Sequence, residues 1–392
     1  MPSSDGIENK LKLPVYMDYQ ATTPLDRRVL DAMIPYLTET FGNPHSTSHV
    51  FGWEAAEAVE RAREQVAGLI GAAPDDIIFT SGATESNNLA LKGVARAYKP
   101  RRDHIITVVS EHKCVLESAH ALEREGFAVT YLPVDTDGLI DLDALDAAIT
   151  ERTALISVMA VNNEIGVIQP LAEIGALAHA HGVLFHTDAA QATGKIPLDV
   201  KDMNIDLMSI SGHKIYAPKG VGALYRRRRI RLEPLFSGGG QEAGVRSGTL
   251  APAQCVGLGT ACILAAQQME TDRDRIEGLS NRLLSGLRAR ISDVRLNGHA
   301  TRRWPGNLNL SFGGVRSDLL IAGLRDLAVS WGAACASAER EPSHVLAALG
   351  LADDEVAASV RFGLGRFTTL AEVDYAIDRV ASQVERLRAQ AA

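Results

Sequence analysis

The chain has 392 residues, which favours two domains that share a cleft, because a single hydrophobic core rarely grows beyond about 250–300 residues. Apolar residues make up 46% of the chain and charged residues 22%, as in an ordinary soluble globular protein. The formal net charge of −8 argues against a protein that binds nucleic acid through long-range attraction. We therefore expect no stable binding of nucleic acid.

The cysteines and the N-terminal residues indicate the cellular compartment in which the protein works. Cys114, Cys255, Cys262 and Cys335 show no CxxC spacing, so they predict neither a disulfide framework nor a zinc site. The first six residues are polar and include an acid, with no basic and then apolar stretch of a secretory signal. No uncharged apolar run approaches the roughly 18 residues that span a bilayer. We expect a cytoplasmic protein without a membrane segment.

Helical and strand patterns alternate from about residue 54 to residue 225. Ala55, Val59, Ala62, Val66 and Leu69 recur at intervals of four and three, which predicts an amphipathic helix. Short apolar runs that predict strands lie at 77–79, 105–109, 129–132, 155–161, 183–185 and 207–210, with helices between them at 88–97, 115–125 and 171–181. Several runs are continuous, as in strands covered on both faces. This order predicts an α/β fold with a mainly parallel sheet.

The pattern changes after about residue 265. Long polar helices at 276–291 and 370–388 flank short strands near 308–312 and 359–363, which predicts a smaller α+β domain. We expect a large domain over 24–265 and a small domain made of 1–23 and 266–392.

Ligands of an open parallel sheet bind at the carboxyl ends of its strands. The small residues at 80–87 precede a predicted helix, so they fit a phosphate site, although an ordinary helix cap fits them equally. Asp188 follows the strand at 183–185 and has the chemistry to keep a pyridinium nitrogen protonated, or to cap the next helix.

Lys214 follows the strand at 207–210 beside a glycine and polar neighbours. A lysine in this place is suited to form a Schiff base, whereas a lone lysine is ordinarily a solvated surface group. The order of phosphate loop, aspartate and lysine fits a site for pyridoxal phosphate.

Small residues surround Cys335 ahead of a helical stretch at 344–349, as a loop that delivers a thiolate requires. A buried structural cysteine is the alternative for this position. We expect Cys114, Cys255 and Cys262 to be structural residues of helices.

Taken together, these motifs resemble those of the cysteine desulfurases of the aminotransferase class V group, in the branch of the NifS and IscS types. The matching segments are 18–24, 41–44, 80–85, 111–113, 161–166, 187–191, 211–214, 246–249 and 361–363. The resemblance runs nearly end to end. It implies the fold-type I architecture of pyridoxal-phosphate-dependent transferases, a homodimer, and an enzyme that converts L-cysteine to L-alanine.

The resemblance also implies a role for each matching residue. Lys214 binds the cofactor covalently, Asp188 pairs with its pyridine nitrogen, and Gln191 contacts its ring hydroxyl. The residues that hold its phosphate are Ala83, Thr84, Ser211 and His213, with Thr249 contributed by the second subunit.

The remaining implied roles concern the substrate. His112 stacks on the cofactor ring and assists proton transfers. Asn163 and Arg361 hold the substrate carboxylate, and Cys335 accepts the sulfur as a persulfide. The persulfide then passes its sulfur to an acceptor, with iron–sulfur cluster assembly, nitrogenase maturation and transfer-RNA thiolation left open.

Two features depart from the family pattern. The family loop commonly reads Ser-x-Gly-Ser-Ala-Cys, whereas this chain has Ala333 in place of the second serine and the bulky Trp331 at x. Because the attack needs no hydroxyl, we expect altered mobility or rate of the loop at about 328–342, with function retained. The second departure is at the C-terminus. The chain stops at Ala392, soon after the last predicted helix, whereas IscS-type members often carry a longer tail that docks the iron–sulfur scaffold. A scaffold partnership therefore stays open here.

Other interpretations compete with this one. The first is a different enzyme of the same group, such as a selenocysteine lyase or an aminotransferase, but an aminotransferase has no use for a loop thiol such as Cys335. The second is a catalytically silent protein, which has no use for Lys214 and Asp188. The glycines at 238–240 lack the GxGxxG spacing of a nicotinamide site. The basic cluster of Arg226, Arg227, Arg228, Arg229 and Arg231 favours a solvated face over a site for an acidic protein or transfer RNA.

Overall fold

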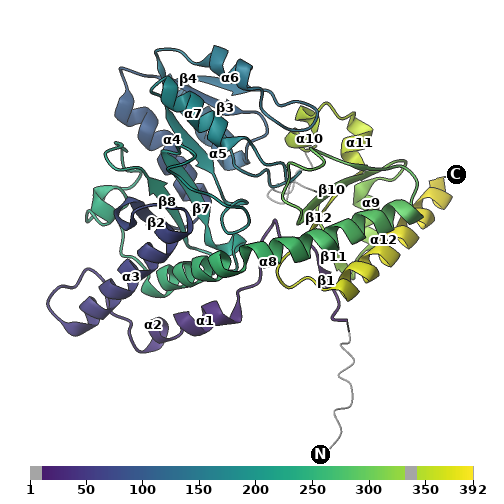
Figure 1. Ribbon diagram of the computed structural model, residues 1–392, viewed down its shortest axis with the longest axis horizontal. Coiled ribbons are helices and arrows are strands. Elements are labelled where there is room, and N and C mark those ends of the chain that lie inside the picture. The colour runs from purple at the N-terminus through teal and green to yellow at the C-terminus, as the bar shows by residue number, and fades with distance from the viewer. Residues whose placement is uncertain (1–10, 332–341, 392) are drawn as a thin grey trace, which may run out of the picture.

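A seven-stranded sheet frames the larger part of the molecule, and its strand order is β2-β8-β7-β6-β5-β3-β4. Its strands are β2 (Ile77–Thr80), β3 (His104–Val108), β4 (Ala128–Leu132), β5 (Thr153–Ser157), β6 (Leu184–Asp188), β7 (Leu207–Ser211) and β8 (Gly222–Arg226). This is seen in a computed structural model that describes residues 11–331 and 342–391 (Figure 1). All neighbours run parallel except β8, which is antiparallel to both β2 and β7. The predicted α/β fold with a mainly parallel sheet is confirmed.

Both faces of this sheet are covered, which explains the continuous apolar runs of its strands. Successive residues of one strand belong to different hydrophobic clusters, as Ile105 and Ile106 show. The helices of this part are α1 (Arg27–Met33), α2 (Pro35–Thr38), α3 (Val50–Leu69), α4 (Ala83–Tyr98), α5 (Lys113–Arg124), α6 (Leu142–Ala148) and α7 (Leu171–Ala180).

The smaller part is built on a three-stranded antiparallel sheet of order β12-β10-β9. Its strands are β9 (Val294–Leu296), β10 (Asn307–Phe312) and β12 (Ser359–Gly363), and its helices are α9 (Ser317–Gly323), α10 (His344–Ala348), α11 (Asp353–Ala357) and α12 (Leu370–Ala391). The N-terminal strand β1 (Val15–Tyr16) pairs in parallel with β11 (Leu327–Ala328), so the first described residues join this part.

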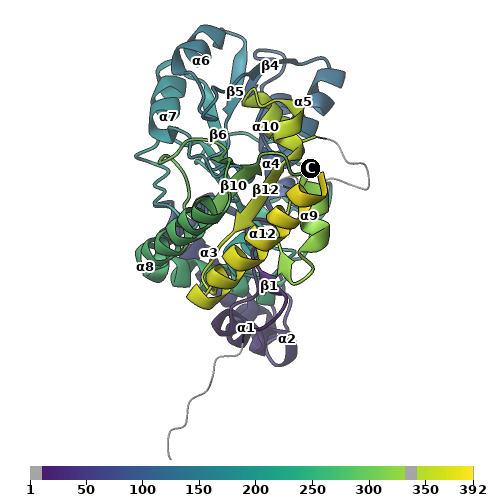
Figure 2. The same ribbon diagram turned by 90° about the vertical axis from the view of Figure 1, so that its right-hand side faces the viewer.

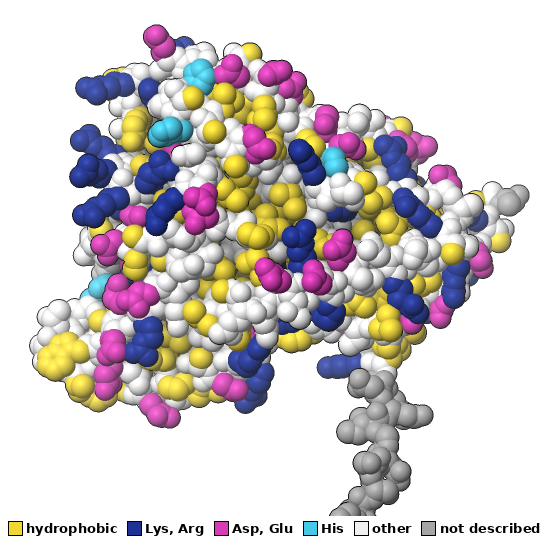
Figure 3. Space-filling view, viewed as in Figure 1, with side chains coloured by type: hydrophobic (Ala, Val, Ile, Leu, Met, Phe, Trp, Pro, Cys, Tyr) yellow, Lys and Arg dark blue, Asp and Glu magenta, His cyan; other side chains and the backbone are white. Residues whose placement is uncertain are grey.

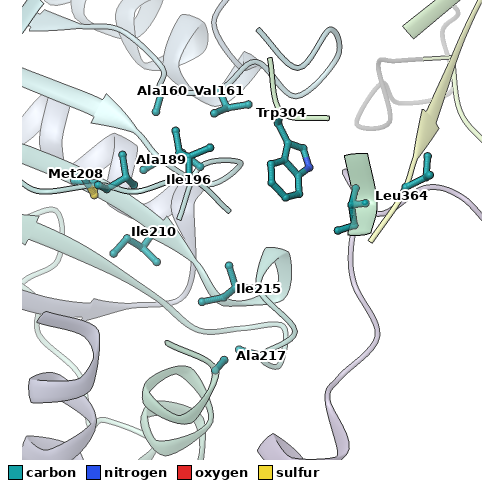
Figure 4. Packing of buried hydrophobic residues seen from close by; sticks show 14 of the residues in the cluster. Ala160, Val161, Ala189, Ile196, Met208, Ile210, Ile215, Ala217, Trp304 and Leu364 are labelled. Carbon is teal, nitrogen blue, oxygen red and sulfur yellow. The ribbon is translucent and has the colours of Figure 1, made fainter. Parts of the chain in front are cut away.

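One helix, α8 (Pro252–Arg290), connects the two parts. Its first half packs on α3 and its second half packs on α12, as the two ribbon views show (Figures 1 and 2). The domain boundary predicted near residue 265 falls inside this helix. The buried side chain of Trp304 lies between the cluster around Ala189 and Ile196 and the side chain of Leu364, so apolar packing continues from one part to the other (Figure 4).

Two element boundaries differ from the sequence-based expectation. Helix α4 begins at Ala83 and not at 88, because Gly82, at φ 148°, turns the chain directly from β2 into the helix. Strand β6 extends to Asp188, which pairs with Ser209 of β7, so the aspartate ends the strand itself. Both shifts place candidate site residues, Ala83 and Asp188, at or next to the carboxyl end of a strand.

Candidate active site

A cavity of about 480 Å³ opens at the carboxyl ends of β6 and β7 and reaches across to β12 of the smaller part. Its volume falls within the range of about 300–1,000 Å³ that is usual for small-molecule sites. The predicted site residues that line it are Ala83, Thr84, His112, Asn163, Asp188, Gln191, Ser211, His213, Lys214 and Arg361. The cavity therefore brings together ten side chains from segments that are far apart in the sequence.

The amine of Lys214 lies against the chain that follows β1. Its Nζ donates hydrogen bonds to the backbone carbonyls of Gln20 at 2.5 Å and Ala21 at 2.7 Å. The lysine ends the short 3-10 turn Gly212–Lys214 that follows β7. Gly212 is needed there, because a Cβ on it would meet the carbonyl oxygen of Val221 at 2.9 Å.

Asp188 ends β6 with 5% of its surface exposed. One carboxylate oxygen accepts from the backbone N–H of Ala190 at 2.9 Å, and the other accepts from Nδ2 of Asn87 at 2.7 Å. Complete burial, together with the nearby charge of Asp188, raises the pKa of Glu111 well above its ordinary value. Of the two acids, Glu111 is therefore the one that burial favours in its neutral form.

The first turn of α4 forms one end of the cavity, where Ala83 and Thr84 line it. The first N–H groups of a helix have no partner within the helix and favour an anion. His213 lines the same cavity, and its Nδ1 is 3.0 Å from Oγ1 of Thr22. Burial, reinforced by the charge of Lys214, lowers the pKa of His213 to about 4, so this imidazole is neutral at neutral pH. An anion here would meet neutral hydrogen-bond donors.

Arg361 lies in β12 and is only 1% exposed. Its guanidinium donates to Oδ1 of Asp18 at 2.8 Å and to the backbone carbonyl of Asn163 at 2.9 Å. Asn163 thus contacts the arginine through its main chain. The planar fork of an arginine suits a carboxylate, and Asp18 is the carboxylate that it meets here.

His112 is the N-cap residue of α5, and its Nδ1 accepts from the backbone N–H of Cys114 at 3.2 Å. The Sγ atom of Cys114 lies 3.0 Å from the same Nδ1. Cys114 is a helix residue, as predicted, but it also lines the cavity, which the sequence analysis did not anticipate. In the sequence, Cys114 stands two residues after His112, where a helix is expected to follow a strand, and this position was the only sign that it could reach the cavity.

Thr249 and the cysteine loop remain to be placed among the predicted site residues. Thr249 is exposed and does not line the cavity, and its contribution to the site of a second subunit stays a prediction. Cys335 and Ala333 lie outside the described residues, whereas Trp331 is 44% exposed.

The arginine cluster after β8 is only partly solvated. Arg228 and Arg229 are exposed, whereas Arg227 lies 3.2 Å from Asp206 in an ion pair. Lysine and arginine side chains gather along the left edge of the space-filling view (Figure 3).

Comparisons with known proteins agree with this geometry. The aminotransferase class-V family profile matches residues 15–376. The cysteine desulfurase IscS of Rickettsia massiliae is 58% identical over 382 residues, which cover 97% of this chain and 93% of that protein. A solved NifS-like protein is 38% identical with a TM-score of 0.89, covering 95% of this chain and 99% of its own. A protein called SspA, solved in complex with cysteine, is 38% identical with a TM-score of 0.79 over 91% of this chain and all of its own.

The fold and the site define a class-V aminotransferase architecture. The chain belongs to this family and, within it, to the cysteine desulfurases of the NifS/IscS type, whose cofactor is pyridoxal phosphate. The described residues fit that cofactor, because the cavity holds an amine, a buried carboxylate and a helix N-terminus for the phosphate. Among the described residues, no helix is both long and apolar enough to cross a membrane.

Proposed function

We propose that this chain takes sulfur from L-cysteine, carries it as a persulfide on Cys335 and releases L-alanine. The observation that carries the proposal is the convergence of Lys214, Asp188 and Arg361 on one cavity. The relative that was solved with cysteine supports the same substrate.

Each of these residues has a distinct task in the proposed reaction. Lys214 would hold pyridoxal phosphate covalently, Asp188 would face its ring nitrogen, and Ala83, Thr84, Ser211 and His213 would surround its phosphate. When bound, the cofactor supplies an electron sink for bond breaking next to the substrate amine. The amine of Lys214 is the group within the cavity that is suited to remove the Cα proton.

The substrate carboxylate and sulfur need two further groups. Arg361 offers a guanidinium to the carboxylate, at the place where Asp18 already lies. Cys335 attacks the substrate sulfur as a thiolate, so an S–S bond forms while the C–S bond breaks and its electron pair stays with the three-carbon product. Because a free thiol has a pKa of about 8.5, a base is needed at neutral pH, and we assign this proton management to His112.

Trapping the cofactor tests the central assignment. Borohydride reduction of the holoenzyme, followed by peptide mapping, should place the cofactor label on Lys214. Label on another lysine, or none, would contradict the assignment. Cys335→Ala should keep the cofactor absorption and its change with L-cysteine but form no persulfide, whereas Cys262→Ala serves as a matched control in helix α8. Normal alanine production by Cys335→Ala would refute the role of Cys335.

We also infer that the chain acts as a homodimer. An exposed apolar patch, which we call the arm patch, lies over the α2–α3 connection at the lower left of Figure 3 and consists of Leu37, Phe41, Val50, Phe51 and Trp53. The most exposed of them, Phe41, leaves 66% of its surface open. Contiguous apolar surface of this kind is typical of a subunit interface.

Introducing negative charges into the arm patch tests the dimer. Phe41→Glu combined with Trp53→Glu should give a monomer by light scattering and should weaken cofactor binding, because Thr249 would no longer reach the second site. Leu319→Glu, on the exposed side of α9, is the control and should leave the dimer intact. A variant pair that stays dimeric would contradict the placement of the interface.

The destination of the sulfur is the remaining part of the proposal. We infer that the enzyme works in the cytoplasm and delivers the persulfide sulfur to an acceptor, such as an iron–sulfur scaffold protein or a component of transfer-RNA thiolation. Capture of partners by the sulfur-loaded enzyme from its own cell extract, with Cys335→Ala as the control, would identify the acceptor by its acquired sulfur.

A further inference from the structure

A chain of hydrogen bonds runs along one edge of the cavity and joins three elements of the fold. Nδ2 of Asn87, in α4, lies 2.7 Å from Oδ2 of Asp188 and 3.1 Å from Sγ of Cys114. The same sulfur, in α5, lies 3.0 Å from Nδ1 of His112. Asp188 at the end of β6 is thereby connected to His112 through two intervening side chains.

We propose that Cys114 is a positioning residue for His112, and that Asn87 and Cys114 together couple the orientation of His112 to that of Asp188. The proposal rests on the proposed function, in which His112 and Asp188 face the same cofactor ring. It adds Asn87 and Cys114 as residues that hold His112 and Asp188 in a fixed relative orientation.

The chemistry of the donors fixes the direction of each bond. The amide Nδ2 of Asn87 can only donate, so Asp188 and the sulfur of Cys114 both accept from it. Nδ1 of His112 already accepts from the backbone N–H of Cys114 at 3.2 Å, so it presents a lone pair. The thiol hydrogen therefore points to Nδ1, and Nε2 of His112 carries the ring hydrogen.

The surroundings make Cys114 unlike two other cysteines of the chain. Cys255 and Cys262 are buried in α8, and burial raises the pKa of each thiol to about 12. Cys114 is only partly buried and lines the cavity. Asn87, by contrast, has no exposed surface, so its amide has little freedom to turn away from Asp188 and Cys114.

Removal of the sulfur should loosen His112 while leaving the fold in place. In Cys114→Ala we expect the affinity of the apoprotein for pyridoxal phosphate to fall by about fivefold, the equivalent of one lost hydrogen bond. The visible circular dichroism of the bound cofactor should change, because it reports the orientation of the ring. The value of kcat should fall, and KM for L-cysteine should stay within about twofold, since the carboxylate is bound elsewhere.

Two further variants separate positioning from a merely structural role. Cys114→Ser should restore cofactor affinity and the dichroism band, because a hydroxyl also donates to Nδ1 and accepts from Asn87. Cys262→Ala removes a buried sulfur from α8 and should leave both readouts unchanged. Wild-type affinity and dichroism in Cys114→Ala, or the absence of rescue by Cys114→Ser, would overturn the proposal.

A chemical probe of the unaltered protein gives an independent test. Iodoacetamide should alkylate Cys114 in the apoprotein, and bound pyridoxal phosphate should protect it, as followed by peptide mapping. Equal labelling with and without the cofactor would overturn the proposal. The affinity, dichroism and labelling measurements need no substrate, so they stay decisive even if the protein proved inactive on L-cysteine, which would contradict the proposed function alone.

Discussion

Oδ1 of Asp18 lies 2.8 Å from the guanidinium of Arg361, so the chain supplies its own carboxylate to the arginine that we assign to the substrate. The arginine side chain is 1% exposed and the aspartate side chain 18% exposed. A charge that is buried this deeply needs a partner, because its desolvation costs several kcal/mol. Asp18 therefore stabilises Arg361 in place before any substrate arrives.

Asp18→Asn should expose this dependence. We expect the free energy of unfolding to fall by about 3 kcal/mol, because the variant removes the carboxylate of Asp18 from a buried guanidinium. L-alanine, which offers a carboxylate, should raise the melting temperature of the variant more than that of the wild type. Asp318→Asn, from a pair with the exposed Arg316, is the control and should change stability by less than about 1 kcal/mol. Equal losses in the two variants would argue against a buried pair.

Arg361→Lys tests the geometry of the fork. A lysine keeps the positive charge but cannot donate to Asp18, the carbonyl of Asn163 and a substrate carboxylate from one plane. We expect KM for L-cysteine to rise by about tenfold or more, with a smaller change in kcat, because the lost contact is made in the ground state as well. Steady-state kinetics would show it, and a change confined to kcat would contradict the assignment.

His186 should make the folded state sensitive to acid. Its ring is fully buried between the hydroxyls of Ser157 at 2.8 Å and Ser209 at 3.0 Å, and burial lowers its pKa from 6.5 to about 3. At pH values between these two, the unfolded chain binds a proton that the folded chain does not. Stability is therefore unaffected by this group above about pH 6.5 and is lost below it, by up to about 1.4 kcal/mol per pH unit.

Urea unfolding over a series of pH values would measure this effect. The slope of the unfolding free energy against pH reports how many protons the chain takes up on unfolding. In His186→Gln this number should be smaller by about one, at acid pH, than in the wild type. His120→Gln, which removes an imidazole that is 45% exposed, is the matched control. Identical slopes for His186→Gln and the wild type would show that another group causes the loss.

Gly222 should be intolerant of a side chain because it packs against the backbone of Gly82, which leads into α4. A Cβ there would meet the carbonyl oxygen of Ile210 at 2.4 Å and the Cα of Gly82 at 2.6 Å, both backbone atoms. Gly222→Ala should lower stability by about 1–3 kcal/mol and weaken cofactor binding. Gly68→Ala, where a Cβ meets nothing within 4 Å in α3, should be neutral or stabilising by up to about 1 kcal/mol. Equal melting temperatures and cofactor affinities for the two variants would contradict this prediction.

The sequence predicted the residues that follow strands better than the contacts between distant segments. Lys214 and Asp188 could be found because an apolar run and a polar neighbour mark the carboxyl end of a parallel strand. The pair of Asp18 and Arg361 joins residues at opposite ends of the chain, and no periodicity records such a contact. The role of Cys114 likewise depends on where the first turn of α5 points, which only the tertiary structure decides.

The predicted domain boundary near residue 265 has a similar explanation. The first half of α8 is buried against α3, whereas the second half is largely exposed, so the composition changes inside one helix. The change from apolar to polar residues marks the point beyond which only one face of the helix, with Ile276, Leu279, Leu283 and Leu287, stays buried. The division into two domains stays a prediction.

The continuity of α8 also bears on how the molecule responds to heat. At 39 residues it is about 58 Å long, and helices α3 and α12 pack on different halves of it. Loosening either end removes the support of the other, so melting should be a single cooperative event, with one calorimetric peak for the apoprotein. Two separated peaks would mean that the two halves of α8 unfold independently, each together with its own part of the molecule.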